Sequence, residues 1–147
     1  RGRFYSTPAV AYGRVYVGST DGRVYSFGAV TGRLRWSHRT GGYVYGSAAV
    51  WDGLVLVGSY DRHFYAFDAA TGDVRWRLDA GGPISGSATV IDGVVWFATL
   101  PGRTFALDAR TGRILWRGAQ GKYAPAVSDG TRLFLVGNGG VSGLVRR

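Results

Sequence analysis

The chain has 147 residues and a net charge of +9, and 46% of its residues are hydrophobic. This length suits a single domain over 1–147, and the apolar content excludes a disordered tail. The chain lacks Cys, Met and Glu, which excludes disulfides and cysteine zinc sites, whereas 25 Gly with many Val, Tyr and Trp favour strands joined by tight turns. No apolar run is long enough to span a membrane, and no secretory signal is present.

The sequence repeats with a step of 40 residues, which is clearest at Trp36, Trp76 and Trp116. We expect three full repeats, at about 1–40, 41–80 and 81–120, and an incomplete fourth at 121–147. The fourth copy starts three residues early and ends without a Thr-Gly pair or a Trp. Because residue 1 is Arg, we expect the chain to be a piece of a longer or processed protein.

Within one repeat the hydrophobic period is two, which predicts strands. In the second copy the predicted strands are 47–51, 54–58, 63–67 and 74–78, with Asp52-Gly53 as the first hairpin turn. In the last strand, Val74, Trp76 and Leu78 are expected to face inward, like Leu34 and Trp36 in the first copy. The first strand of each copy carries small residues such as Ser47, Ala48 and Ala49, which suits a position near a central axis.

Four antiparallel strands in about 40 residues are typical of a β-propeller blade. The predicted fold is therefore all-β, a partial β-propeller of four-stranded antiparallel blades, three complete and most of a fourth.

The pattern Ala-x-Asp-x-x-Thr-Gly-x-x-x-Trp resembles the tryptophan-docking motif of the pyrroloquinoline-quinone-like (PQQ-like, quinoprotein-type) β-propeller repeats. The first copy departs from the motif at Ser26 and Gly28. The residues that carry the resemblance are Thr31, Gly32, Trp36, Ala66, Asp68, Thr71, Gly72, Trp76, Ala106, Asp108, Thr111, Gly112 and Trp116. The resemblance implies that each Trp packs against the Gly peptide of the adjacent blade.

The family contains both enzymes and interaction modules. Its dehydrogenases hold PQQ with Ca²⁺ bound by Glu and Asn side chains, beside a catalytic Asp and often a vicinal disulfide. This chain has no Glu and no Cys, and its single Asn is Asn138. We therefore favour a non-catalytic interaction or scaffold module of a larger extracytoplasmic bacterial protein. The alternative is a fragment of a PQQ-dependent dehydrogenase whose catalytic blades lie outside this chain, and only this alternative requires PQQ and calcium.

No residue stands out as catalytic, cofactor-binding or metal-binding. Asp68 and Asp108 are expected to accept turn N–H groups, and other Asp residues precede Gly in hairpins. Asp61 and Asp73 are interpreted as solvated surface charges. His38 and His63 lie in different blades, so they predict no metal site.

Two exposed-loop aromatics, Tyr43 and Tyr45, are the candidate partner face, for a protein or a peptide. The competing interpretation is that they fill gaps between blades. The Arg residues are scattered along the whole chain, which does not favour a nucleic acid as partner.

Both ends of the arc are predicted to expose a blade flank. The missing neighbours would be the remaining blades of a larger ring, which we favour, or a second copy of the chain. In isolation we expect fraying of residues 121–147 and association that depends on concentration.

Overall fold

The strands form four antiparallel sheets that follow one another along the chain. The computed structural model describes residues 2–119, 126–137 and 140–145. The predicted fraying of 121–147 concerns in part residues outside these ranges. In the described residues there are no helices, and hence none that could cross a bilayer.

Each sheet corresponds to one predicted blade, and its strands are adjacent in chain order. Blade 1 contains β1 (Ala9–Ala11), β2 (Arg14–Gly18), β3 (Arg23–Gly28) and β4 (Leu34–Arg39). Blade 2 contains β5 (Ala49–Trp51), β6 (Leu54–Gly58), β7 (His63–Asp68) and β8 (Val74–Asp79). Blade 3 contains β9 (Thr89–Ile91), β10 (Val94–Ala98), β11 (Thr104–Asp108) and β12 (Ile114–Gly118). Blade 4 contains β13 (Ala126–Ser128), β14 (Arg132–Gly137) and β15 (Gly140–Val145).

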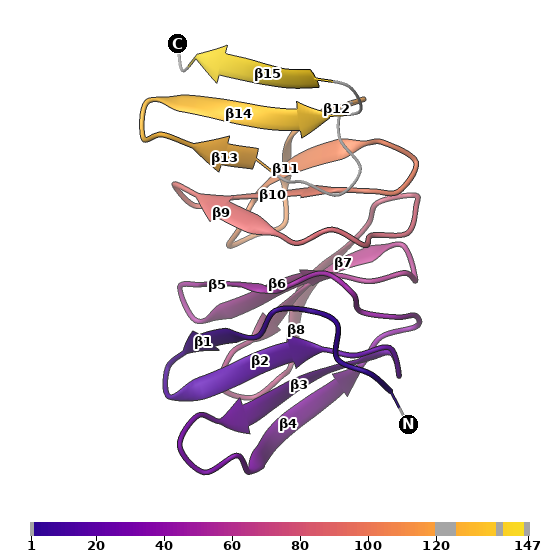
Figure 1. The fold of residues 1–147 in the computed structure, drawn as a ribbon, viewed down its shortest axis with the longest axis vertical. Helices are drawn as coiled ribbons and strands as arrows, with labels where there is room; N and C mark the ends of the chain where they lie inside the picture. The colour runs from indigo at the N-terminus through magenta and orange to yellow at the C-terminus, as the bar shows by residue number, and fades with distance from the viewer. Residues whose placement is uncertain (1, 120–125, 138–139, 146–147) are drawn as a thin grey trace.

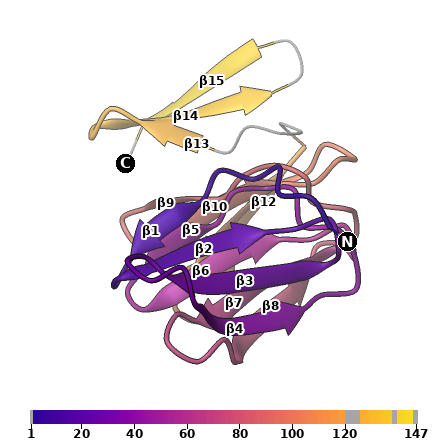
Figure 2. The same cartoon turned by 60° about the horizontal axis from the view of Figure 1, so that its bottom comes forward.

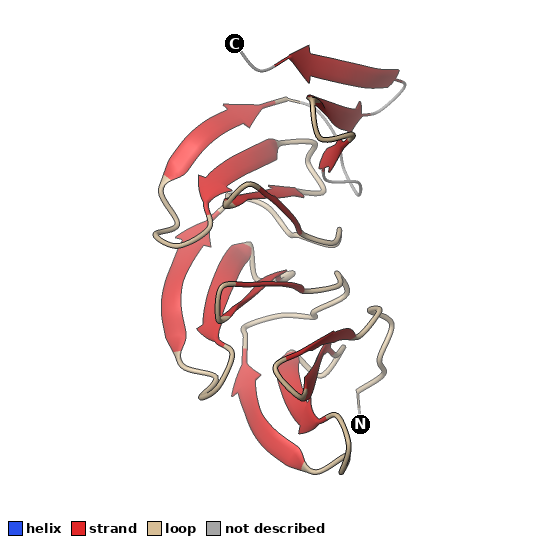
Figure 3. Ribbon diagram, turned by 90° about the vertical axis from the view of Figure 1, so that its left-hand side faces the viewer, coloured by secondary structure: helices blue, strands red, loops and turns tan. Residues whose placement is uncertain are grey.

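The four sheets stack face to face in a curved row (Figures 1 and 3). The predicted all-β partial propeller is confirmed, and the row is an open arc. The segments just before the innermost strands are linked between blades by hydrogen bonds from backbone N–H groups to serine Oγ atoms. Thr7 N donates to Ser47 Oγ at 2.9 Å, and Ser47 N donates to Ser87 Oγ at 3.1 Å. Small residues are required here because the sheets converge.

The hydrophobic core is divided among the gaps between blades. Tyr16 and Val24 of blade 1 pack against Val55 and Phe67 of blade 2. In the next gap, Phe64 of blade 2 stacks on Phe97 of blade 3, with 4.0 Å between ring centroids. Each blade therefore depends on its neighbours to bury its two faces.

The two-residue hairpins were predicted correctly. Asp52 and Asp92 have φ of 45° and 50°, and the glycines that follow, Gly53 and Gly93, have φ of 76° and 75°. Two consecutive left-handed residues give the turn whose twist matches antiparallel strands, which explains the Asp-Gly signal.

The predicted inward orientation of Val74 and Leu34 is wrong. Val74 is 38% exposed and Leu34 is 55% exposed. In blade 2 the ladder pairs Ala66 with Trp76 and then Phe67 with Val74, so Arg75 is an extra residue in a β-bulge. The bulge breaks the alternation, and Val74 no longer shares a face with Trp76.

Blade 4 differs from the other blades in which face of its sheet packs against the preceding blade. Leu135 pairs with Ala126 in the same way that Trp96 pairs with Thr89 and Leu56 with Ala49. Leu56 points toward the following blade, but Leu135 packs with Trp96 of the preceding one. The segment between Trp116 and Ala126 is three residues shorter than its counterparts. Blade 4 thus packs the opposite face of its sheet against the preceding blade.

Ser26 of β3 occupies the position that is alanine in the next two blades, Ala66 and Ala106. It is completely buried, and its Oγ has no hydrogen-bond partner among the described residues. An unpaired buried hydroxyl costs about 1–3 kcal/mol. We therefore expect Ser26→Ala to raise the free energy of unfolding by about 1 kcal/mol, measured by urea denaturation. The reverse change in blade 2, Ala66→Ser, serves as the control and is expected to lower it; a loss of stability in Ser26→Ala would contradict the explanation.

Candidate interaction site

The Thr-Gly turn and the following Trp bring neighbouring blades together. The Nε1 of Trp36 donates to the Ala69 carbonyl of blade 2 at 3.0 Å. Its ring covers Gly72, where an added Cβ would lie 2.6 Å from the indole Cδ2. A side chain of any size at position 72 would therefore displace the indole.

The same contacts recur between blades 2 and 3. Trp76 Nε1 donates to the Ala109 carbonyl at 3.1 Å, and a Cβ on Gly112 would lie 2.7 Å from the Trp76 ring. Both glycines have positive φ, 80° at Gly72 and 74° at Gly112. The turn therefore needs glycine both for its backbone conformation and for the close approach of the ring.

Asp68 and Asp108 stabilise these turns from within. Asp68 Oδ1 accepts the N–H groups of Ala70 and Thr71 at 2.8 and 3.0 Å, and its Oδ2 lies 3.1 Å from Arg75. Asp108 Oδ1 accepts the N–H groups of Arg110 and Thr111 at 3.1 and 2.8 Å. The hydrogen bonds with Thr71, led by its backbone N–H, hold the pKa of the Asp68 carboxyl below its usual value. The carboxylates of Asp68 and Asp108 therefore stabilise the turns that contain them.

At the two ends of the arc the docking arrangement is incomplete. An added Cβ on Gly32 would meet nothing within 4 Å, so no indole covers the turn of Thr31 and Gly32. At the other end, Trp116 stays half-buried beside Trp96, with 5.9 Å between ring centroids. Among the described residues, no backbone carbonyl accepts a hydrogen bond from Trp116 Nε1 of the kind that Trp36 and Trp76 donate.

Four tyrosines form one patch where the loops of blades 1 and 2 meet, which we call the tyrosine patch (Tyr5, Tyr43, Tyr45 and Tyr60). Tyr45 is its centre, with ring centroids 5.8 Å from Tyr5, 5.8 Å from Tyr43 and 5.1 Å from Tyr60. Tyr5 and Tyr43 are 60% and 51% exposed. The patch thus presents aromatic surface to solvent from two blades.

The sequence analysis selected Tyr43 and Tyr45 but missed Tyr5 as their partner. The signal was present, since Tyr5 and Tyr45 are one repeat step apart. Tyr45 and Tyr60 are half-buried in the seam between blades, while the Tyr43 ring extends outward. Some tyrosines of the patch therefore fill the gap between blades, and others form exposed surface.

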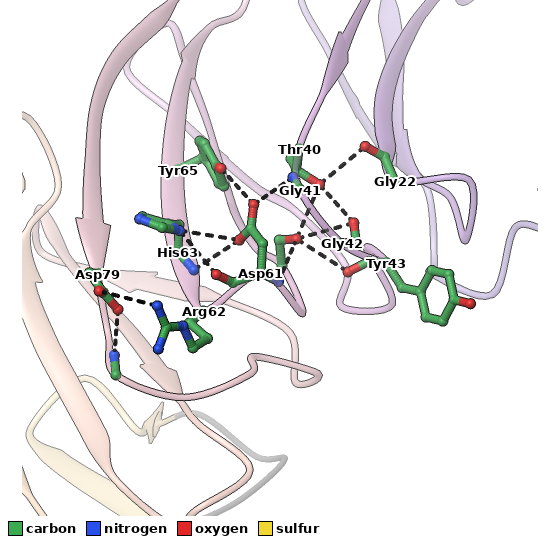
Figure 4. A network of polar contacts seen from close by, with 12 residues as sticks. Gly22, Thr40, Gly41, Gly42, Tyr43, Asp61, Arg62, His63, Tyr65 and Asp79 are labelled. Atoms are coloured by element: carbon green, nitrogen blue, oxygen red, sulfur yellow. Dashed lines mark hydrogen bonds and ion pairs between the residues drawn. The ribbon is translucent and has the colours of Figure 1, made fainter.

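Beside the patch, Asp61 ties the loop between the blades to blade 2 (Figure 4). Its Oδ2 accepts the Gly41 N–H at 2.7 Å and the Tyr65 hydroxyl at 2.7 Å, and its Oδ1 accepts the His63 N–H at 2.9 Å. The neighbouring Ser59 Oγ bonds to Thr40 Oγ1 at 3.1 Å. The prediction that Asp61 is a solvated charge is wrong, because its side chain is only 11% exposed.

Burial opposes the ionisation of Asp61, but the hydrogen bonds from Tyr65, His63 and Gly41 outweigh it and lower the pKa of its carboxyl. When the pKa of a carboxyl group is lower in the folded than in the unfolded protein, its ionisation stabilises the fold at pH values above the unfolded-state pKa. This stabilisation is lost as the pH falls through the folded-state pKa. We expect Asp61→Asn to lower the free energy of unfolding at pH 7 by about 1–2 kcal/mol, and the difference from wild type to shrink as the pH falls through the lowered pKa of the Asp61 carboxyl. Urea unfolding across this pH range measures both effects.

Asp21 provides the matched control, since it makes the same bonds within blade 1 to Tyr25 and Arg23. The segment before β1 does lie beside Asp21, since an added Cβ on Gly2 would lie 2.7 Å from the Asp21 Cβ, but among the described residues no N–H group of that segment donates to the Asp21 carboxylate. Asp21→Asn is therefore expected to cost less than Asp61→Asn, and equal losses would show that the bond between blades adds nothing.

The remaining titratable groups do not converge. His38 packs on Phe67, with 4.9 Å between ring centroids, and His63 lies beside Asp61. The described residues contain no group of three His, Cys, Asp or Glu side chains that could hold a metal ion. Asn138 lies outside the described residues.

Comparisons with known proteins agree with the repeat pattern. The family model described as outer membrane protein assembly factor BamB matches residues 1–135. Among solved structures, BamB from Moraxella catarrhalis superposes with a TM-score of 0.83 at 18% identity, over 97% of this chain and 46% of that one. The chain thus spans about half the length of that relative.

Two further structures extend the comparison. Quinohemoprotein alcohol dehydrogenase from Comamonas testosteroni matches with a TM-score of 0.72 at 26% identity, over 81% of this chain and 21% of that one. The computationally designed Ika4 protein matches with a TM-score of 0.84 at 17% identity, over 99% of this chain and 92% of that one. No curated protein matches at a significant level. The 40-residue repeat, the stacked sheets and the family match together show that this chain belongs to the BamB family of PQQ-like repeat propellers.

Proposed function

We propose that this chain is a non-catalytic propeller module that binds an extended protein segment on the tyrosine patch. The observation that carries the proposal is the cluster of four tyrosine rings, two of them more than half exposed, on one face of the arc. Tyrosine offers a large rigid ring and a hydroxyl, and it is enriched at protein interfaces for both reasons. The description of the matching family, outer membrane protein assembly factor BamB, supports this assignment.

The positive charge of the chain indicates that the bound segment carries acidic side chains. Arg3 Nη1 lies 3.3 Å from the Tyr5 hydroxyl at the edge of the patch, and the chain as a whole carries a charge of +9. A segment with acidic side chains beside its apolar ones would be attracted to such a surface.

The test is selection of peptides from a displayed random library on the purified chain, followed by fluorescence polarisation with a selected peptide. Tyr43→Ala should weaken binding by about tenfold or more, because an exposed aromatic anchor that becomes buried by the partner contributes about 1–2 kcal/mol or more. Tyr12→Ala is the control, since Tyr12 is 60% exposed at the β1–β2 hairpin on the opposite side of the sheets. Absence of selected peptides, or equal binding by both variants, would contradict the proposal.

The alternative function is a fragment of a PQQ-dependent dehydrogenase with its catalytic blades elsewhere. It is favoured by the 26% identity to quinohemoprotein alcohol dehydrogenase over 81% of this chain. Alcohol-dependent dye reduction by the complete parent protein, supplied with PQQ and Ca²⁺, would support the alternative and remove the first proposal.

Under either function we place the protein outside the cytoplasm, in the periplasm or at the cell surface of a bacterium. The support is the family description, which names outer membrane protein assembly. Fractionation of cells that produce the complete parent protein tests this placement.

A further inference from the structure

The turn between the second and third strands has the same backbone form in blades 1, 2 and 3, but its side chains differ in blade 3. The last residue of the turn has positive φ and donates its N–H to the carbonyl three residues earlier, at Gly22 (81°), Arg62 (76°) and Gly102 (92°). The residue before it is Asp21 in blade 1, Asp61 in blade 2 and Pro101 in blade 3. Blade 3 therefore lacks the carboxylate that the other two blades hold at this position.

In blades 1 and 2 an arginine lies near this carboxylate or near the hydroxyl that bonds to it. Asp61 accepts a hydrogen bond from the Tyr65 hydroxyl at 2.7 Å. Arg77 lies opposite Tyr65 in the ladder of blade 2 and interacts with the same hydroxyl. In blade 1 the Arg23 guanidinium lies close enough to the Asp21 carboxylate to interact with its charge. The positive charge of these two arginines is therefore partly offset within the blade.

Blade 3 keeps the basic side chains but has lost both the carboxylate and the hydroxyl. Phe105 stands at the repeat position of Tyr65, Arg103 at that of Arg23, and Arg117 at that of Arg77. Arg117 pairs with Phe105 in the ladder, and Arg103 precedes Phe105 by two residues, so all three belong to one face of the sheet. Both arginines are exposed, and neither forms an ion pair within residues 2–119, 126–137 and 140–145.

A cavity of about 300 Å³ lies between these side chains, and we call it the arginine pocket. The residues that line it are Arg103, Phe105, Arg117, Gly118 and Ala119. The Phe105 ring is 5% exposed and belongs to the core between blades 2 and 3, so it forms a fixed apolar wall. Arg103 extends toward the loop before blade 3, since an added Cβ on Gly81 would lie 3.6 Å from Arg103 Nη1. The pocket thus combines two guanidinium groups with one apolar wall.

The arginine pocket lies on the same edge of the stacked sheets as the tyrosine patch. The turns that follow β2, β6 and β10 lie along one edge, opposite the hairpins that begin the blades (Figures 1 and 2). Tyr60 of the patch is in the turn after β6, and Arg103 follows the turn after β10. Packed sheets are about 10 Å apart, which is the length of about three residues of extended chain. One extended segment can therefore reach both the patch and the pocket.

We propose that Arg103 and Arg117 bind the carboxylate of an acidic side chain in an extended protein segment. Guanidinium groups form charge-assisted, paired hydrogen bonds with a carboxylate, which replaces the internal carboxylate that blade 3 lacks. The methylene groups of an aspartate or glutamate side chain would pack on the Phe105 ring. Naming the segment rests on the proposed function, whereas the carboxylate site itself rests only on the residues of blade 3.

The first test is a nuclear magnetic resonance titration of the arginine Nε–H signals of the 147-residue chain with a tetraglutamate peptide. The signals of Arg103 and Arg117 are expected to saturate together, at about tenfold lower peptide concentration than those of Arg23 and Arg77. A tetraglutamine peptide is the neutral control and should shift none of them. Inorganic phosphate is the competing anion, and tighter binding of phosphate than of tetraglutamate would overturn the assignment to a carboxylate.

Three variants test the residues of the pocket. Arg103→Gln and Arg117→Gln should each weaken tetraglutamate binding by about tenfold or more. Pro101→Asp keeps both arginines but restores the carboxylate of the other blades, and it should weaken binding as strongly. Arg77→Gln is the matched control, because it removes one positive charge at the same repeat position of blade 2 and should leave binding unchanged. Circular dichroism confirms that each variant is folded.

The pocket and the tyrosine patch can fail separately. The carboxylate site is overturned if the signals of Arg103 and Arg117 do not saturate, if all four arginines bind alike, or if Pro101→Asp binds as wild type does. Tyr43→Ala should leave the tetraglutamate titration unchanged, so a failure of the patch does not affect it. A peptide selected on the patch should bind Arg103→Gln about tenfold more weakly, and an unchanged affinity would overturn the link between the pocket and that segment.

Discussion

Trp36→Ala is expected to lower the free energy of unfolding by about 3–5 kcal/mol, the cost of removing a large buried aromatic side chain. The Trp36 ring is 8% exposed, covers Gly72 and donates to the Ala69 carbonyl, so its loss leaves a cavity and removes one of the two hydrogen bonds to that carbonyl, the other coming from the Tyr16 hydroxyl. Urea denaturation followed by circular dichroism measures the loss. Trp36→Phe separates the two contributions, because phenylalanine retains part of the packing but cannot donate the hydrogen bond.

Trp116→Ala is the matched comparison within the same chain. Trp116 stands at the same repeat position but is only half-buried, without the docking contacts of Trp36. Its replacement is expected to cost less than half as much as that of Trp36. Equal losses from both replacements would show that the Gly turn of the neighbouring blade does not contribute to stability.

Gly72→Ala is expected to lower the free energy of unfolding by about 2–4 kcal/mol. Two costs add, since alanine is disfavoured at a φ of 80° and its Cβ would lie 2.6 Å from the Trp36 indole. The indole would have to move, which also lengthens its hydrogen bond to Ala69. Thermal and urea unfolding of the variant measure the combined effect.

Gly32→Ala isolates the backbone contribution. Gly32 has a φ of 65° in the same turn of blade 1, and an added Cβ meets nothing within 4 Å. We expect this variant to lose only about 1 kcal/mol in the monomer, the cost of the left-handed conformation. If Gly32→Ala lost as much as Gly72→Ala, contact with the indole would not be the reason for glycine at this turn.

The strands, their order in each blade and the hairpin turns could be predicted from the sequence because they depend on local properties. A period of two in β6 and β7, and Asp52-Gly53 between β5 and β6, specify the same structure wherever they occur. The 40-residue spacing of Trp36, Trp76 and Trp116 further predicts that the repeats form equivalent blades. Local pattern could not place Val74, because a single bulge at Arg75 reversed its direction.

Several properties of the candidate site depend on which blade lies next to a residue. Asp21 and Asp61 stand at the same repeat position, but within residues 2–119, 126–137 and 140–145 only Asp61 receives an N–H group from the loop before its blade. Likewise, Gly32 and Gly72 have similar backbone conformations, and only Gly72 is covered by an indole. Tyr5 joins Tyr45 only because blades 1 and 2 lie side by side.

The sequence by itself determined a chain of PQQ-like propeller repeats, since strand period, turn chemistry and repeat spacing are properties of short segments. The tertiary structure decided which repeats have neighbours and which faces stay open. The clearest case is blade 4, whose strand pattern is that of the other blades but whose Leu135 contacts blade 3 while Val127 faces solvent. The physical reason is that a sheet can bury either of two apolar faces, and the surface that packs beside it determines which one is buried.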